Sequence, residues 1–328
     1  MKRIYSIFVI LMNLLMIRND WTYNEIKKLY HQPLLELVYK AAMVNREYHD
    51  PLKMKISMLI SVKTGACAED CSYCAQSSRY KTHVSSQKTL SVDEVMKEAA
   101  DAKSKGVERV CLSASWREIP EGKAFDDLLK MIAGVKEMGL SVCCTTGMLN
   151  KNQSAQLAEA GITAYNHNLD TSDEYYPNII STRSYQERLD TINCLIDAKV
   201  QHCTGGIIGM GESENDRISM IHKLATLRKH PYTVPLNMLV PIEGTPLEKQ
   251  KPVEVFEMLR MIATVRNVMP ESKICLAAGR KQMSDEGQAL CFMAGANSIF
   301  VGTKLLTTPN PEMESDLNLL NKLGLQTF

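Results

Sequence analysis

The chain has 328 residues, of which 45% are hydrophobic and 23% are charged, so it is long enough to bury the core of one large α/β domain. Its formal net charge at pH 7 is +1, which favours neither nucleic acid nor an acidic membrane as a partner, and we expect a small molecule instead. Ten cysteines are too sparse for a disulfide scaffold, so we expect reduced, metal-binding thiols in a cytoplasmic protein.

The first sixteen residues place two basic residues before an apolar run, an arrangement that resembles a secretory signal peptide. However, no small-residue cleavage site follows, Asn13 interrupts the run, and the run is too short to span a bilayer. A start codon placed too far upstream, with the true start at Met16, explains the pattern equally well. We therefore treat residues 1–20 as an N-terminal extension and residues 21–328 as the domain.

Four segments of that domain share one order of features, namely a helical run, a glycine and a short strand rich in β-branched residues. A glycine just after a helix supplies the left-handed position that ends it. These glycines are Gly106, Gly139, Gly161 and Gly295. After a helical N-terminal cap over 21–55, the pattern predicts strands near 56–63, 107–113, 140–145, 162–169, 200–208, 234–240, 272–277 and 296–301, and helices over 92–105, 125–138, 151–160, 184–198, 214–229, 252–269 and 284–294.

Eight strands that alternate with helices indicate parallel pairing with right-handed crossovers. A (βα)8 barrel of the TIM type is the simplest closure of such a chain, and a doubly wound open sheet is the alternative. In a barrel enzyme, the functional side chains lie at the carboxyl ends of the strands. We therefore expect the functional residues in the segments that follow the strands.

The most specific motif directly follows the first strand and consists of Cys67, Cys71 and Cys74. Thiolates at this C-x3-C-x2-C spacing can hold three irons of a 4Fe-4S cubane and leave the fourth iron without a protein ligand. A zinc knuckle and a ferredoxin-like loop are the alternatives. Both usually need a fourth nearby ligand, and none follows before His83. The spacing therefore favours a cluster with an open coordination site.

Three further cysteines occupy predicted strands at positions that share one face with polar neighbours. Cys111, Cys143 and Cys203 lie on three different strands, and they converge if that face is the barrel interior. The alternative is that each is a small buried residue, because free cysteine is often buried. Three other cysteines lack this placement, and we assign them to the hydrophobic core: Cys144, Cys194 and Cys291.

The context of the first motif, KTGAC followed by CSYCAQSSRY, is similar to the signature of radical S-adenosylmethionine enzymes and closely resembles the biotin synthase family. The resemblance extends from Trp21 to the C-terminus and includes YNHNLDT at 165–171, GGIIGMGE at 205–212 and PLNMLVPIEGTPL at 235–247. It implies radical-mediated insertion of sulfur into dethiobiotin to form biotin.

The resemblance also implies two clusters. Cys67, Cys71 and Cys74 would hold a 4Fe-4S cluster whose open iron binds S-adenosylmethionine. A 2Fe-2S cluster inside the barrel would be held by a second set, Cys111, Cys143 and Cys203. The family's fourth ligand to that cluster is an arginine, and this chain has Cys275 in its place. Whether Cys275 binds the iron is left open, because a cysteine side chain is shorter than an arginine.

Other roles implied by the resemblance concern the cofactor and the substrate. Asp170 would accept hydrogen bonds from the ribose, Tyr73 would lie by the adenine, and Arg188 would stand near the cofactor carboxylate. Without the resemblance, the asparagines and glycines of the two sets given next could be ordinary barrel and turn residues. The full cofactor set is Tyr73, Asn168, Asp170, Arg188, Gly205, Gly206 and Ile207, and the substrate set is Asn166, Asn168, Asn237, Thr307 and Thr308.

The expected partners are dethiobiotin, a flavodoxin- or ferredoxin-type electron donor, iron–sulfur assembly proteins and a second copy of the chain in a homodimer. One alternative is another radical enzyme on the same barrel, such as a hydrogenase-maturation or pyrrolysine-pathway protein. Lipoyl synthase is disfavoured because no cysteine precedes Cys67. From another class, the alternative is a non-catalytic 4Fe-4S electron carrier, which would not cleave S-adenosylmethionine.

Overall fold

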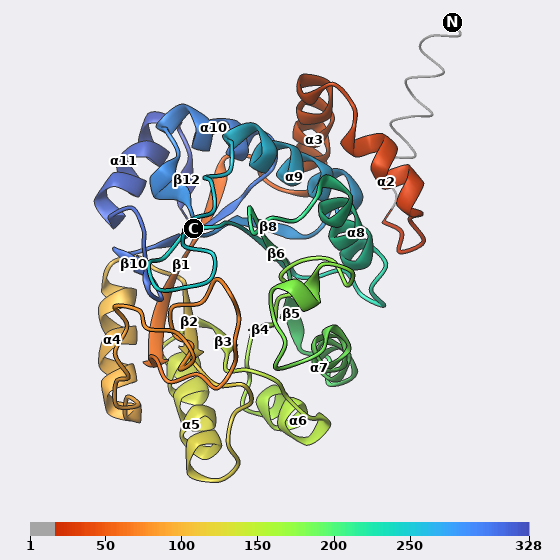
Figure 1. Cartoon of the computed structure of the whole chain (residues 1–328). Coiled ribbons are helices and arrows are strands. Elements are labelled where there is room, and N and C mark those ends of the chain that lie inside the picture. The colour runs from red at the N-terminus through yellow and green to blue at the C-terminus, as the bar shows by residue number, and fades with distance from the viewer. Residues whose placement is uncertain (1–16, 328) are drawn as a thin grey trace, which may run out of the picture.

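The computed structural model describes residues 17–327. Their parallel strands form a closed barrel with the helices outside it (Figure 1). The strand order is β1-β2-β3-β4-β5-β7-β8-β9, and β9 pairs back onto β1. This closure confirms the predicted (βα)8 barrel and excludes the open sheet. Most of the predicted 1–20 extension lies outside the described residues.

The strands of the barrel lie close to the predicted ranges. Their bounds are β1 Lys53–Lys63, β2 Arg109–Ala114, β3 Ser141–Thr145, β4 Ala164–Asn166, β5 Gln201–Cys203, β6 Gly206–Ile208, β7 Thr233–Met238, β8 Lys273–Leu276 and β9 Ser298–Val301. Three further short strands are β10 Lys304–Leu305, β11 Thr308–Pro309 and β12 Gln326–Thr327, of which β12 extends the edge of β1.

The predicted fifth strand, 200–208, is divided into β5 and β6. The division falls at Thr204 and Gly205, where the chain passes very close to β7. A Cβ atom on Gly205 would lie only 2.0 Å from the carbonyl oxygen of Pro235. The strand prediction was therefore wrong in continuity, because β-branched composition does not reveal this close backbone approach. Together, β5 and β6 occupy the fifth position of the barrel.

The helices begin and end where local sequence signals place them. Ser91, Ser184 and Ser213 each cap a helix through a reciprocal capping box. The bounds are α2 Tyr23–Tyr30, α3 Leu34–Tyr48, α4 Val92–Ser104, α5 Lys123–Glu137, α6 Lys151–Glu159, α7 Tyr185–Asp197, α8 Glu214–Ala225, α9 Val255–Val268, α10 Asp285–Met293 and α11 Met313–Lys322, with 3-10 turns at Tyr176–Asn178 and Arg280–Gln282.

Two helical predictions need correction. The predicted helices ended with the seventh barrel helix and did not include α11, whose first turn follows two prolines. It also extended α8 to residue 229, whereas α8 ends at Ala225 and Thr226 forms its cap. Thr226 turns its hydroxyl back onto the carbonyl oxygen of His222, as threonine does near helix ends. The predicted N-terminal cap is confirmed as α2 and α3.

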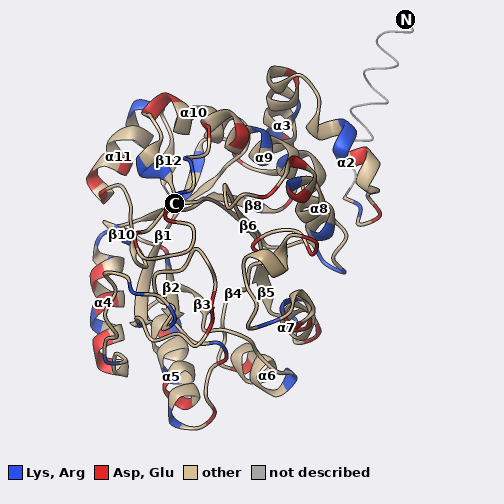
Figure 2. Ribbon diagram, viewed as in Figure 1, with Lys and Arg blue, Asp and Glu red and all other residues tan. Residues whose placement is uncertain are grey.

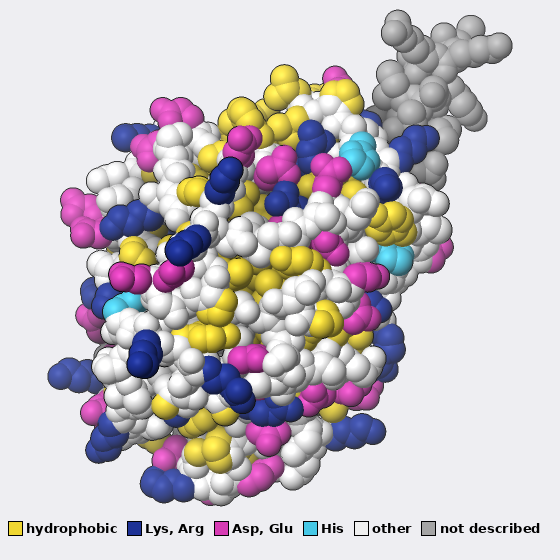
Figure 3. All heavy atoms as spheres, viewed as in Figure 1, with side chains coloured by type: hydrophobic (Ala, Val, Ile, Leu, Met, Phe, Trp, Pro, Cys, Tyr) yellow, Lys and Arg dark blue, Asp and Glu magenta, His cyan; other side chains and the backbone are white. Residues whose placement is uncertain are grey.

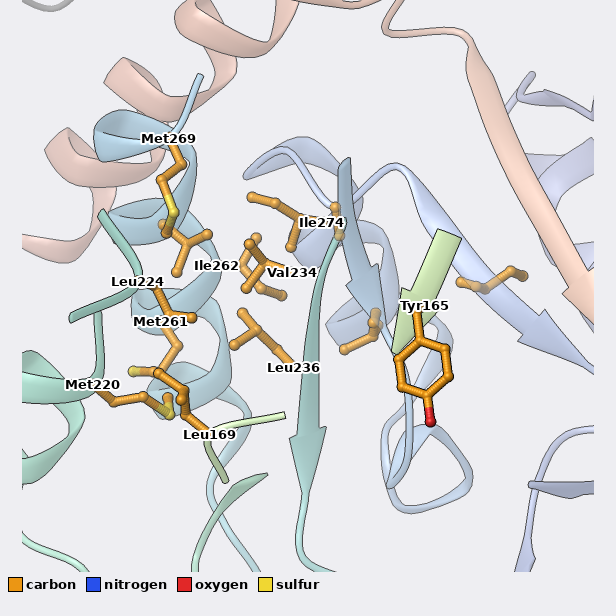
Figure 4. Close-up of a cluster of buried hydrophobic side chains, with 14 of the residues drawn as sticks. Tyr165, Leu169, Met220, Leu224, Val234, Leu236, Met261, Ile262, Met269 and Ile274 are labelled. Carbon is orange, nitrogen blue, oxygen red and sulfur yellow. The ribbon is translucent and has the colours of Figure 1, made fainter. Parts of the chain in front are cut away.

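The main hydrophobic core lies between the barrel and its helices. In Figure 4, Met220 and Leu224 of α8 and Met261 and Ile262 of α9 lie beside Val234 and Leu236 of β7. Charged residues lie mostly on the outer helices and loops (Figure 2). None of the helices within residues 17–327 is long and apolar enough to cross a membrane. The side chains inside the barrel form a second cluster, separate from this main core.

Candidate active site

A pocket opens at the carboxyl ends of the strands, where a barrel enzyme binds its substrate. It is lined by the loop after β1, the ends of β4, β6, β7 and β8, and the segment 305–308. Twelve of the residues singled out from the sequence line it: Cys67, Cys71, Tyr73, Cys74, Asn166, Asn168, Asp170, Arg188, Ile207, Asn237, Thr307 and Thr308. Gly205 and Gly206 lie beside it, where Gly206 bridges to Asp170.

The loop after β1 is folded so that its cysteines face this pocket. The backbone N–H of Cys67 donates to the carbonyl of Gln76 at 2.9 Å, and Cys74 closes a turn onto Cys71 at 2.9 Å. The loop enters through Gly65, at φ 77°, where a Cβ atom would lie 2.9 Å from Ser86. These bonds fix the loop as a collar around the side chains of its three cysteines.

The collar thiols lie in a protected environment. Burial raises the pKa of the Cys71 thiol to about 11 and that of Cys74 to about 12. Among the described residues, no three ligating side chains are close enough to share one metal ion. Thiolates around a cubane are farther apart, since each binds a different iron. Iron binding would displace the thiol protons, and the Arg183 guanidinium lies 3.8 Å from the Cys71 sulfur.

A buried network joins the end of β4 to α7. Asp170, whose backbone is left-handed at φ 68°, forms an ion pair with Arg188 and accepts a hydrogen bond of 2.8 Å from Tyr73. Arg188 also donates to the hydroxyl of Tyr176 and to the carbonyl of Asn168, both at 2.7 Å. The two charges thus neutralise each other, and these hydrogen bonds hold the side chains of Asp170 and Arg188 in fixed orientations at the pocket wall.

The three asparagines of the pocket differ in what their amides already bind. Asn237 donates to Gly206 at 3.0 Å and accepts from Ala278 at 3.1 Å. Asn168 accepts from the N–H of Gly205 at 3.1 Å. Asn166 alone has a buried side-chain oxygen without a partner among the described residues. Asn166 is therefore the asparagine best placed to accept a hydrogen bond from a ligand.

A second group of thiols lies inside the barrel. Cys111, Cys143 and Cys203 pack with Ala164 in an interior cluster that Tyr232 and Phe300 border. The Cys143 thiol is hydrogen-bonded to those of Cys111 and Cys203. The bond with Cys111, together with burial, holds the pKa of Cys143 well above its usual range, while the bond with Cys203 acts in the opposite direction. The structure therefore brings together three sulfur atoms from β2, β3 and β5.

Cys275 lies in the same interior on β8. Its backbone is in register with Ser298 on β9 and Pro235 on β7, and its thiol is hydrogen-bonded to Ser298. Burial raises the pKa of this thiol to about 12, and the charge of Cys203 acts in the same direction. Cys275 is thus a fourth thiol beside the interior group.

The remaining cysteines separate as expected, with one exception. Cys144 and Cys291 are fully buried in the outer core between strands and helices. Cys194 is only half-buried, so its assignment to the core was wrong. It lies on α7 beside the buried Leu195, at the edge of the helix face that packs on the barrel. A lone cysteine in a helix carries little information on which side of that edge it falls.

Sequence reasoning assigned no role to two residues that line the pocket, His167 and Arg183. His167 Nε2 and Arg183 Nε are buried and lack hydrogen-bond partners among the described residues, although Arg183 Nε forms an ion pair with Glu69 at 3.8 Å. Burial holds the pKa of His167 well below its usual range, so its imidazole is neutral. The signal that marks His167 is its position, because it lies in the segment 165–171 that carries the family resemblance.

At the opposite end of the barrel, Arg109 lies two residues before Cys111 and was given no role from the sequence. Its guanidinium stacks over Tyr232, with 5.1 Å between its carbon and the ring centroid. Burial lowers the pKa of Arg109, but the thiols of Cys203, Cys143 and Cys111 more than offset this and raise it. Lys273 donates to the Tyr232 hydroxyl at 3.0 Å nearby.

Comparison with known proteins identifies two family models along the chain. Residues 61–224 match the Radical SAM superfamily, and residues 235–326 match the Biotin and Thiamin Synthesis associated domain. A biotin synthase of Christiangramia forsetii is 53% identical over 309 residues, which cover 94% of this chain and 85% of that protein. The mitochondrial biotin synthase of Arabidopsis thaliana is 52% identical, with 94% and 82% covered.

Solved structures with the same fold are more distant in sequence. Methylornithine synthase superposes with a TM-score of 0.79 at 20% identity and covers 94% of both chains. The FeFe-hydrogenase maturase HydG from Carboxydothermus hydrogenoformans gives a TM-score of 0.81 at 16% identity, covering 99% of this chain and 80% of that one. At these identities the likeness concerns the barrel fold alone.

Proposed function

This chain belongs to the biotin synthase family of radical S-adenosylmethionine enzymes, and from that premise we propose which residues insert sulfur into dethiobiotin. As a member, it is a sulfurtransferase that uses S-adenosylmethionine and iron–sulfur clusters. Cys67, Cys71 and Cys74 would hold a 4Fe-4S cluster, hereafter the rim cluster. A 2Fe-2S cluster, the inner cluster, would be held by Cys111, Cys143 and Cys203. The supporting observation is that these thiols form two groups at different depths of one barrel.

The donor atoms and free polar groups fit the proposed cofactors. Thiolates are the usual ligands of iron–sulfur clusters. The rim pocket also contains buried polar atoms without hydrogen-bond partners among the described residues, on Asn166, His167 and Arg183. Such atoms are rare in folded proteins, and a polar ligand such as S-adenosylmethionine would satisfy them. The pocket therefore suits a charged organic cofactor beside a cluster.

We assign the cofactor to the side of the pocket formed by β4, β6 and the collar loop. Asp170 would accept hydrogen bonds from the ribose hydroxyls while Arg188, already paired with it, stands toward the carboxylate. Tyr73 would lie against the adenine. The backbone at Gly205, Gly206 and Ile207 and the side chain of Asn168 would complete that wall, where glycine lets a ligand approach closely.

Dethiobiotin would lie between this wall and the segment 305–308. Asn166 would accept from the ureido ring, and Thr307 would donate to the carboxylate. Thr308 would lie beside the carboxylate, with its hydroxyl donating to the carbonyl of Leu305 at 2.9 Å. Asn168 and Asn237, whose amides bind backbone groups, would shape the ring pocket. When bound, the cofactors would supply the 5′-deoxyadenosyl radical that removes hydrogen from dethiobiotin and the sulfur that replaces it. The chain's own contribution is placement and the exclusion of water, for which a closed barrel is suited.

The wider setting follows from the same proposal. A flavodoxin- or ferredoxin-type protein would donate electrons, and iron–sulfur assembly proteins would load the clusters in the cytoplasm. Residues 21–328 would act as one domain. We further propose a homodimer, because α3 leaves Leu35 and Tyr39 exposed at 77% and 60%. Figure 3 shows hydrophobic side chains along the edge of the molecule where Figure 1 places α3.

The test of this function is an anaerobic incubation of the reconstituted protein with dethiobiotin, S-adenosylmethionine and a reductant. Biotin and 5′-deoxyadenosine should both accumulate. A non-catalytic electron carrier on this fold would form neither product, and a radical enzyme with another substrate would form 5′-deoxyadenosine without biotin.

Replacing Cys275 by arginine should raise the midpoint potential of the inner cluster if Cys275 is its fourth ligand. A thiolate makes the centre more negative by one charge than a neutral ligand, and so harder to reduce. We expect a rise of more than about 59 mV, since about 59 mV corresponds to a tenfold change in a one-electron reduction equilibrium. The measurement is an anaerobic redox titration, with Cys275→Ser as the control of similar size. An unchanged potential in Cys275→Arg would exclude Cys275 as a ligand.

A further inference from the structure

The end of the barrel opposite the pocket contains a buried cation whose donors lack partners. Arg109 at the start of β2 is only 4% exposed, and its Nε and Nη2 atoms have no hydrogen-bond partner among the described residues. No carboxylate within residues 17–327 forms an ion pair with it, and its ring contact is Tyr232. A buried charge without a counter-charge is strongly destabilising. The site is therefore incomplete without an anion.

Two kinds of group near Arg109 can become anionic: the phenol of Tyr232, which Lys273 already hydrogen-bonds, and the interior thiols. Arg109 and Cys111 are two residues apart on β2, so their side chains point to the same face of the strand. Tyr232, over which the Arg109 guanidinium stacks, also borders the interior cluster of Cys111, Cys143 and Cys203. A cluster held by thiolates carries a net negative charge, which would supply the missing counter-charge.

Two other cations near this site are already engaged, whereas Lys55 is buried, and burial followed by the charge of Arg109 lowers its pKa to about 8. Arg280, whose charge acts on Cys275, forms two hydrogen bonds with Asp316, at 2.5 and 2.8 Å. Lys273 bonds to the hydroxyl of Tyr232. Arg109 thus combines burial, two unused donors and a position on the thiol face.

We propose that Arg109 is a positioning residue of the inner cluster, which donates hydrogen bonds from Nε and Nη2 to its thiolate sulfurs and stabilises its reduced state. This inference rests on the proposed function. Hydrogen bonds and positive charge near cluster sulfurs raise a reduction potential, because reduction adds negative charge. If Cys275 is the fourth ligand, its thiolate would add further negative charge to this site and increase the need for the cation.

The test compares Arg109→Met, Arg109→Lys and Lys273→Met in the full-length, anaerobically reconstituted protein. Mössbauer spectra would count both clusters, and redox titration would give the midpoint potential of each. Arg109→Met should make reduction of the inner cluster at least tenfold less favourable, a fall of about 59 mV for one electron. Arg109→Lys, which keeps the charge without the planar donors, should fall less. Lys273→Met removes an equal charge at the same end and should leave the potential unchanged.

The rim cluster in each sample reports whether the barrel has folded. Loss of only the inner cluster in Arg109→Met supports the proposal, as does the expected fall in potential. An unchanged inner potential, an equal fall in Lys273→Met, or loss of the rim cluster as well would overturn it. If the wild-type protein itself holds no second cluster, the proposed function fails, which the Arg109 variants alone would not show.

Discussion

Cys71→Ala is expected to abolish cleavage of S-adenosylmethionine, and with it all formation of biotin. Cys71 is the central cysteine of the collar loop, and its side chain is 6% exposed at the pocket wall. Changing residues that merely orient metal ligands costs about 10–100-fold in affinity or activity. Removal of a ligand itself should therefore lower cleavage by more than about 100-fold. The measurement is 5′-deoxyadenosine formed under strongly reducing, anaerobic conditions.

The matched control is Cys291→Ala, which removes a thiol that is equally buried but lies in the outer core on α10. It should retain cleavage, because Cys291 belongs neither to the lining of the pocket nor to the interior cluster of thiols. Iron analysis distinguishes loss of the rim cluster from misfolding as the cause of lost cleavage, because Cys71→Ala should lack the rim cluster but keep the inner one. If Cys71→Ala cleaves the cofactor at the wild-type rate, the collar thiols do not hold the cluster that is proposed here.

The barrel was predictable because each of its units carries its own local signals. Ser91, Ser184 and Ser213 begin helices with a capping box, and Gly106 and Gly139 follow the ends of α4 and α5 at φ 77° and 80°. Such signals act within a few residues, so one sequence suffices to read them. The break between β5 and β6 depends instead on Pro235, thirty residues away from Gly205. A contact of that range leaves no mark in the local pattern.

The candidate site shows the same division between local and distant information. The collar motif could be read from spacing, and alternation along strands put Cys111, Cys143 and Cys203 on one face. What Asn237 and Asn168 bind could not be read, because their partners Gly206, Ala278 and Gly205 lie on other elements. For the same reason Arg109 was overlooked. Its unused donors become visible only once the neighbouring strands are in place.

Cys143→Ala is expected to separate the two halves of the reaction. Cys143 lies in the interior group, bonded to the thiols of Cys111 and Cys203, whereas the pocket that would bind S-adenosylmethionine lies at the strand ends. Without this ligand the inner cluster should be lost or depleted. Biotin should then fall by more than about 100-fold, by the same argument from ligand orientation. Cleavage of S-adenosylmethionine should persist, because the collar thiols are intact.

The next residue supplies the control, since Cys144 lies on the same strand but points into the outer core. Cys144→Ala removes a thiol of equal size one position away and should keep both clusters and biotin formation. Any cost there is one of packing, which thermal unfolding would detect without loss of the inner cluster's spectrum. The decisive measurement is the ratio of biotin to 5′-deoxyadenosine in the two variants. A wild-type ratio in Cys143→Ala would show that sulfur comes from elsewhere, because a chain lacking one of the three interior thiols would still transfer it.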